Sequence, residues 1–120
     1  MMVGPELAEA TKIGRHVILV REYAGWGADE LKALAGALTS ADQRLLFCGG
    51  GLEEGHGAIV LAAGGEYEGD LGDALRTILP LFDGRGGGRG RFAQAVGNAE
   101  QLEQAMARAE SILRELGENG

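Results

Sequence analysis

The stretch that decides the fold runs from residue 84 to residue 113 and reads GRGGGRGRFAQAVGNAEQLEQAMARAESIL. It opens with five glycines and three arginines, and no acidic residue occurs before Asn98. The following FAQAVG alternates alanines with larger side chains, which predicts a strand with Phe92, Gln94 and Val96 on one face. Apolar residues then recur at helical spacing from Leu102 to Leu116. We therefore predict a flexible basic loop, a strand and a helix, in that order.

The chain as a whole is acidic, in contrast with this basic segment. Its formal net charge is −7. Its length of 120 residues suits a single domain. Its one cysteine cannot form an intramolecular disulfide, and no apolar leader opens the chain, so we expect a cytoplasmic, reducing location. No apolar run approaches the roughly 18 residues of a membrane span, so we expect no membrane partner.

Strand-like and helix-like segments alternate upstream of residue 84. Short apolar runs typical of buried strands occupy residues 16–20, 44–49 and 58–63. Helical spacing of apolar residues occurs at 28–40 and 69–82. The predicted order is therefore β-α-β-β-α-β-α. We assign it to the α/β (α+β) class, a small mixed β-sheet with helices packed on it.

Glycine, proline and capping residues mark the predicted boundaries of these segments. Asp70 is expected to cap the second helix and Pro80 to kink or end it. Gly117 is expected to stop the last helix. Glycine clusters favour loops, and we predict loops at 49–51, 64–65 and 84–90.

No residue pattern predicts a catalytic or metal site. His16 and His56 belong to no metal-ligand spacing, so we interpret them as strand-edge and hairpin-tip side chains. Cys48 lies in an apolar strand, which favours a buried thiol over a nucleophile. Trp26 lies between a strand and a helix and is interpreted as a packing residue. For this chain alone we predict no catalytic residue, no metal and no cofactor.

The arginines of the glycine-rich segment are the strongest candidates for binding. Consecutive glycines let backbone N–H groups approach an anion, and a guanidinium group binds phosphate through two parallel hydrogen bonds. Arg85, Arg89 and Arg91 supply three such groups within seven residues. From the residues alone, two interpretations stay open: a phosphate-binding loop, or a solvated loop that the arginines keep soluble.

The longer stretch resembles the signature of the DHH-associated domain. In that family a glycine-rich turn is followed by a basic or polar residue, a spacer, an AQ or AA pair, glycines and a helix. FAQAVG is similar to the version at the C-terminus of alanyl-tRNA synthetases and of long free-standing alanyl-tRNA editing proteins. The resemblance covers nearly the whole chain from about Arg15. Two positions depart from the pattern, Val96 where glycine is usual and Gly90 where proline is common.

This resemblance implies a tRNA-binding accessory domain, the C-terminal part of an alanyl-tRNA synthetase or alanyl-tRNA editing protein, that is not catalytic by itself. The expected partners are tRNA, alanine tRNA in particular, and an aminoacylation or editing domain in cis or trans. The editing domain of that family carries HxxxH and CxxxH patterns, and neither occurs in this chain. Motif positions, together with Arg85 and Arg91 added for their charge, give the candidate nucleic-acid-binding residues: Arg85, Gly86, Gly87, Gly88, Arg89, Arg91, Ala93, Gln94 and Gly97.

Two other interpretations belong beside this one. The first is a nucleotide- or phosphate-binding lid domain of a DHH-family phosphodiesterase. Those proteins usually show GGGH followed by AAG, whereas here Arg89 takes the histidine position and Gln94 follows Ala93, which favours tRNA. The second is a homodimerisation module using the stripe from Leu102 to Leu116, although a sheet of this size needs a covering helix. The expected domain organisation is a helical or disordered lead-in, one DHH-associated domain and a tail, at 1–14, 15–117 and 118–120.

Overall fold

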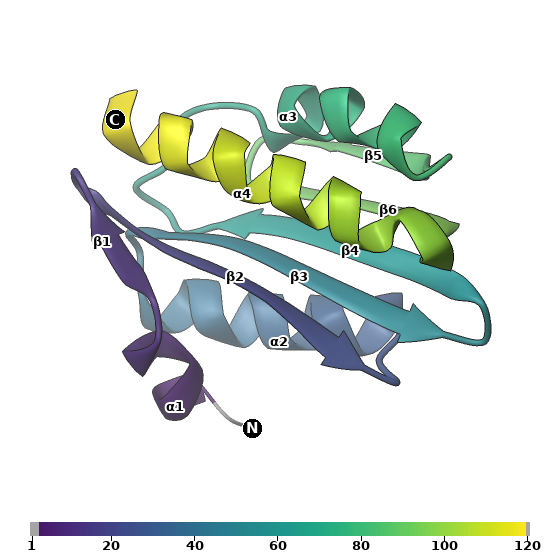
Figure 1. Cartoon of the computed structure of the whole chain (residues 1–120). Helices are drawn as coiled ribbons and strands as arrows, with labels where there is room; N and C mark the ends of the chain where they lie inside the picture. Colours follow the sequence, from purple (N-terminus) through teal and green to yellow (C-terminus); the bar gives the residue numbers. More distant parts are fainter. Residues whose placement is uncertain (1–2, 120) are drawn as a thin grey trace.

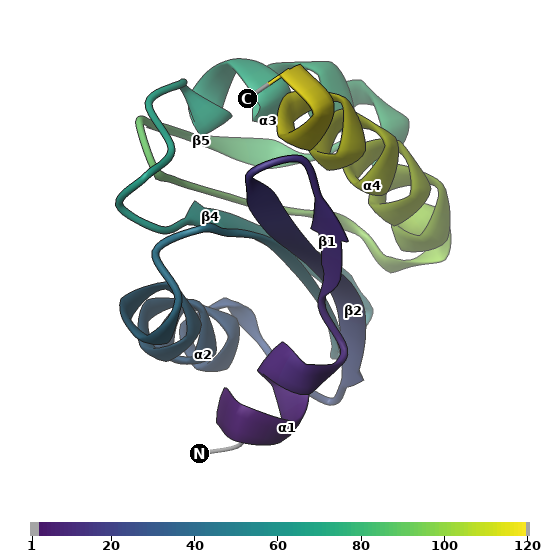
Figure 2. The same cartoon turned by 90° about the vertical axis from the view of Figure 1, so that its left-hand side faces the viewer.

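The computed structural model describes residues 3–119, which form one six-stranded sheet with helices on both faces (Figure 1, Figure 2). The α-helices are α1 (Val3–Ala8), α2 (Ala28–Ala41), α3 (Leu71–Ile78) and α4 (Leu102–Asn119). The strands are β1 (Thr11–Ile13), β2 (His16–Ala24), β3 (Leu45–Glu53), β4 (His56–Ala63), β5 (Arg85–Arg89) and β6 (Phe92–Asn98). Short 3₁₀ helices follow α3 and precede α4, at Leu79–Leu81 and Ala99–Gln101.

The sheet is mixed, and its strands lie in the order β1-β2-β3-β4-β6-β5. Only β2 and β3 pair in parallel, with Val17 opposite Leu45, among the strands that the structure describes. Parallel neighbours need a crossover, and α2 provides it. The predicted class, a small mixed sheet with packed helices, is confirmed. The predicted order β-α-β-β-α-β-α is contained within the longer order observed.

Each face of the sheet has its own layer of buried side chains. α3 and α4 cover one face, and α2 covers the other (Figure 2). Burying one leucine fully contributes roughly 1.5–3 kcal/mol, so α4 is held mainly by its apolar stripe. That stripe packs against the sheet and belongs to the core of this chain, through Leu102, Ala105, Met106, Ala109 and Leu113.

The sequence predicted a loop at the glycine cluster 49–51, but these residues are part of β3. A Cβ atom on Gly50 would lie 2.6 Å from Met106 Sδ, and one on Gly49 would lie 2.7 Å from Phe47 Cζ. Glycine stands here because side chains of α4 and of the sheet itself fill the space beside the backbone. The loop predicted at 84–90 is also wrong, since residues 85–89 form β5.

The predicted helix boundaries are correct in two of three cases. Asp70 Oδ1 accepts a hydrogen bond from Gly72 N–H at 2.8 Å and caps α3. Helix α3 ends at Ile78, and Pro80 lies in the 3₁₀ turn that follows. Gly117 does not stop α4, which continues to Asn119. It is buried against the β1–β2 hairpin, and a Cβ on it would lie 3.0 Å from Ile18 Cδ1.

Two elements precede the first strand that the sequence predicted. Strand β1 pairs antiparallel with the start of β2. Because β1 has only three residues, its pattern is too short to be recognised in the sequence. Helix α1 is held through Glu6, a carboxylate 4% exposed that accepts hydrogen bonds from Tyr23 Oη at 2.6 Å and Arg21 Nη1 at 3.1 Å. Burial and the neighbouring Glu6 raise the pKa of the Tyr23 phenol above its ordinary value. No helix within residues 3–119 is long and apolar enough to cross a membrane.

Candidate nucleic-acid interface

The basic segment forms the outer half of a β-hairpin at the edge of the sheet. β5 pairs antiparallel with β6, with Arg89 opposite Phe92 and Arg85 opposite Val96. The turn between them is two residues long, and its first residue, Gly90, has a φ of +66°. A positive φ at this position suits the tight turns that join antiparallel strands, and glycine adopts it without strain. The three arginines therefore project from an ordered edge strand and its turn.

Asp70 fixes the turn of this hairpin to the beginning of α3. Its Oδ1 atom accepts hydrogen bonds from Gly72 N–H at 2.8 Å and from Gly90 N–H at 2.9 Å. The Leu71 N–H donates in return to Gly90 O at 2.8 Å, and Ala63 N–H donates to Arg91 O at 3.0 Å. The turn is thus hydrogen-bonded on both of its residues, which holds the arginines at a defined place on the surface.

Side chains of the hairpin alternate between a buried and an open face. Residues directly opposite each other on antiparallel strands share a face. Ala93 and Ala95 point into the layer beneath α3 and α4, and Ala93 is 0% exposed. The other face carries Arg85, Arg89, Gln94 and Val96. Helix α2 covers that face over β3 and β4, and leaves it open at the edge strand β5 (Figure 1).

Close packing of the two strands accounts for two of the three consecutive glycines. A Cβ on Gly86 would lie 2.6 Å from Ala95 Cα, and one on Gly88 would lie 2.5 Å from Ala93 Cα. A Cβ on Gly87 would have no atom within 4 Å. Gly86 and Gly88 therefore serve the strand pairing, while Gly87 leaves backbone accessible on the open face.

The remaining motif positions divide between packing and surface. Gly97 lies against Phe82, since a Cβ there would be 2.7 Å from Phe82 Cδ2. Gln94 is half-buried on the open face, between Gly87 of β5 and Val60 of β4. Val96, a departure from the family pattern, is 43% exposed, so a side chain is accommodated there without crowding. Ala93 is fully buried, so it contributes to the candidate site only by packing the hairpin against the core.

The three hairpin arginines are exposed and carry free charges. Arg85, Arg89 and Arg91 make no ion pair with any residue in the range 3–119. Four other arginines are engaged with carboxylates in that range: Arg21, Arg44, Arg76 and Arg114. The acidic residues thus pair with these four arginines, whereas all three arginines of the hairpin are available to an anion.

An open groove of about 780 Å³ lies between the hairpin turn and α2. Its floor is the sheet at Phe92, and its far wall is α2, from which Lys32 reaches over the aromatic ring with Nζ 5.7 Å from the ring centroid. Arg89 and Arg91 line the near side, and Glu68 is its one carboxylate among the described residues. Lys32 and Phe92 were not among the predicted site residues, because only the folded sheet brings α2 beside β6.

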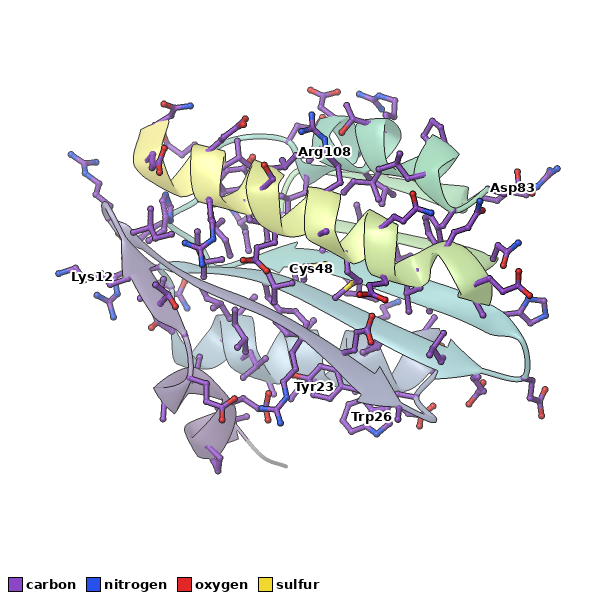
Figure 3. All side chains as sticks on the ribbon, in the orientation of Figure 1. Lys12, Tyr23, Trp26, Cys48, Asp83 and Arg108 are labelled. Carbon is purple, nitrogen blue, oxygen red and sulfur yellow. The ribbon has the colours of Figure 1, made fainter. Side chains whose placement is uncertain are left out.

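Three of the four other side chains considered from the sequence serve packing. His16 is buried, with Nδ1 3.1 Å from Arg44 O, whereas His56 is exposed at the β3–β4 turn. Cys48 lies buried between the sheet and α4 (Figure 3), where burial raises the pKa of its thiol. Trp26 stacks on Tyr23 with ring centroids 4.8 Å apart (Figure 3). Within residues 3–119, no three side chains of histidine, cysteine, aspartate or glutamate gather as metal ligands.

The fold and the hairpin together define a class of small α+β domain with a basic glycine-rich edge. The chain belongs to the DHHA1 domain family, whose model matches residues 15–115. Among solved structures it is similar to the crystal structure of the C-Ala domain from Aquifex aeolicus alanyl-tRNA synthetase, with a TM-score of 0.75 and 18% sequence identity. The match covers 92% of this chain and 98% of that one, a likeness of fold. A search of curated proteins finds no match.

Proposed function

We propose that this chain is a tRNA-binding accessory domain that holds alanine tRNA through the β5–β6 hairpin. The observation that carries the proposal is the cluster of three exposed arginines without ion pairs on an edge hairpin of an acidic chain. Membership of the DHHA1 family and a fold shared with the C-Ala domain of an alanyl-tRNA synthetase support tRNA as the ligand. The binding domain is residues 15–117, acting in the cytoplasm.

The contact is local and weak on its own. Each cation that neutralises a phosphate releases counterions, so binding through three arginines weakens on the order of a hundredfold or more for a tenfold rise in salt. The net charge of −7 opposes broad contact with a polyanion. A domain of this kind gains apparent affinity from being tethered to, or assembled with, an aminoacylation or editing domain that also holds the tRNA.

The experiment that tests the proposal compares single arginines by their salt dependence. Arg89→Ala and Arg91→Ala should each weaken binding of alanine tRNA and lower the salt slope by about one phosphate contact. Arg108→Ala is the matched control, because Arg108 is also exposed and without an ion pair in residues 3–119, but it lies on α4 (Figure 3). Equal affinities and slopes for all three variants and the parent would refute the proposal.

The second candidate function is a phosphate-binding lid of a DHH-family phosphodiesterase, with which family membership is equally compatible. The groove beside Arg89 is the feature that favours it, because its volume lies within the range of small-ligand pockets, roughly 300–1,000 Å³. The same titration separates the two functions when a dinucleotide is included. Tight dinucleotide binding without preference for tRNA would favour the lid.

A further inference from the structure

We propose that the groove between α2 and the β5–β6 turn receives one unstacked nucleotide of a single strand, with its base against Phe92 and its phosphates beside Lys32, Arg89 and Arg91. This inference rests on the proposed function and deepens it. It adds a base contact at Phe92 and a cation on α2, Lys32, to the phosphate contacts of Arg89 and Arg91, while Arg85, at the other end of β5, lies outside the groove lining. It also specifies that the groove binds unpaired nucleic acid.

The groove is large enough to admit a nucleotide. Its volume of about 780 Å³ lies within the roughly 300–1,000 Å³ typical of pockets for small ligands. Small side chains make the space, namely Ala35 and Gly36 on α2 and Ala62 on the floor. Gly36 lies inside a helix, where glycine weakens the helix, and a Cβ there would have no atom within 4 Å. No packing contact explains glycine at this position, and its effect is to keep the groove wide.

The chemistry of the groove suits a nucleotide. The groove lining contains three cations, Lys32, Arg89 and Arg91, and one carboxylate, Glu68, so its charge is net positive. The half-buried ring of Phe92 offers an aromatic surface, and such surfaces stack bases of any sequence. The Lys32 ammonium lies 5.7 Å from the ring centroid, a loose contact that it can exchange for a phosphate when a base takes the ring face.

An unpaired nucleotide suits this groove better than a duplex does. The floor at Phe92 lies between α2, the loop at 65–69 and the hairpin turn. A base inside a duplex is stacked on both sides and cannot reach such a floor unless it leaves the helix. Exposed phosphates of a duplex can still contact Arg85 and the rim of the groove.

The test is a titration of the isotopically labelled protein, followed by amide resonances, with pentaadenylate and with a blunt-ended RNA duplex. Pentaadenylate should shift the amides of Gly36, Arg91 and Phe92, and the duplex should leave those of Gly36 and Phe92 unchanged. Phe92→Leu keeps apolar packing without an aromatic face and should weaken pentaadenylate binding about tenfold. Gly36→Leu fills the groove with a better helix former and should weaken it as much.

The matched control is Ala33→Leu, because Ala33 is exposed on α2 but does not line the groove. It should bind pentaadenylate as the parent does. The inference would be overturned if Gly36→Leu and Phe92→Leu bound pentaadenylate as tightly as the parent while their amide spectra showed that both variants are folded. The same shifts produced by pentaglutamate at equal affinity would overturn it too, since no base is then required. If Arg89→Ala and Arg91→Ala still weaken tRNA binding, the proposed function stands while the groove fails; if neither tRNA nor pentaadenylate binds, both fail.

Discussion

At the scale of single residues, the glycines of β5 differ in what they do. Gly86 and Gly88 stand where β5 and β6 approach so closely that a methyl group would meet the partner backbone. Gly87, between them, has free space beside it and faces the open side of the sheet with Gln94. The run GGG therefore combines two structural requirements with one exposed position that tolerates a side chain.

A pair of neighbouring substitutions tests this distinction. Gly88→Ala should lower the free energy of unfolding by roughly 1–3 kcal/mol, because overpacking forces the strands apart. Gly87→Ala should leave it unchanged or raise it by up to about 1 kcal/mol, since glycine in a strand costs entropy. Urea unfolding of both variants and the parent measures the difference. Equal stability of the two variants would contradict the packing account.

At the scale of elements, α1 is attached to the sheet through a small polar cluster. The buried Glu6 carboxylate is satisfied by the Tyr23 hydroxyl and the Arg21 guanidinium, and Arg21 also contacts Glu9 at 2.5 Å. A buried carboxylate that loses a donor costs about 1–3 kcal/mol. Docking of this helix therefore depends on a hydroxyl group as well as on apolar contact.

Tyr23→Phe should release α1 without unfolding the sheet. Hydrogen exchange of the α1 amides should become faster, while amides of β3 and β4 keep their protection. Thr77→Val, which removes an exposed hydroxyl bonded only within its own helix, is the control and should leave α1 exchange unchanged. Unaltered α1 exchange in Tyr23→Phe would show that the cluster does not hold the helix.

The same cluster predicts a dependence on alkaline pH. The pKa of the Tyr23 phenol is raised in the folded state by burial and by Glu6. Docking is therefore fully favourable below the ordinary phenol pKa of about 10 and weakens as the pH rises above it toward the folded value. Exchange of α1 relative to the sheet, followed between neutral pH and about 11, should show this loss.

At the scale of the whole molecule, the chain is compact, with a radius of gyration of 12.7 Å, and its candidate site is the basic hairpin at one edge of the sheet. Potential metal ligands do not cluster in residues 3–119, and the one cysteine is buried with a raised thiol pKa, which keeps it protonated. The charge distribution is uneven, with unpaired arginines at one sheet edge of a chain of net charge −7. Such an arrangement suits holding a polyanion for chemistry carried out elsewhere.

We accordingly predict that the isolated chain neither attaches alanine to tRNA nor removes misattached serine. Deacylation of seryl-tRNA should stay at the rate without protein, with zinc added, whereas a complete editing enzyme in the same assay should hydrolyse it. A rate above background that survives further purification would contradict the accessory role.

The sequence by itself determined the elements whose signals are local. Apolar periodicity identified α2, α3, α4 and β6, because one face of each must be buried, and Asp70 was recognisable as a cap from its position before α3. The glycine and arginine pattern also predicted a basic segment before β6, although it predicted a loop and not a strand. These features depend on residues within a few positions of each other, so they can be predicted from the sequence.

Only the tertiary structure decided which glycines lie in strands and where the groove is. Gly49–Gly51 and Gly86–Gly88 resemble loops locally, and they form strands because partner strands supply their hydrogen bonds. Met106 fills the space beside Gly50, and the alanines of β6 fill the space beside Gly86 and Gly88. Gly117 resembled a helix stop, but glycine stands there because the β1–β2 hairpin leaves no room for a side chain. Lys32 and Phe92 meet only when α2 packs on the sheet, since contacts between distant segments follow from the folded arrangement and not from local pattern.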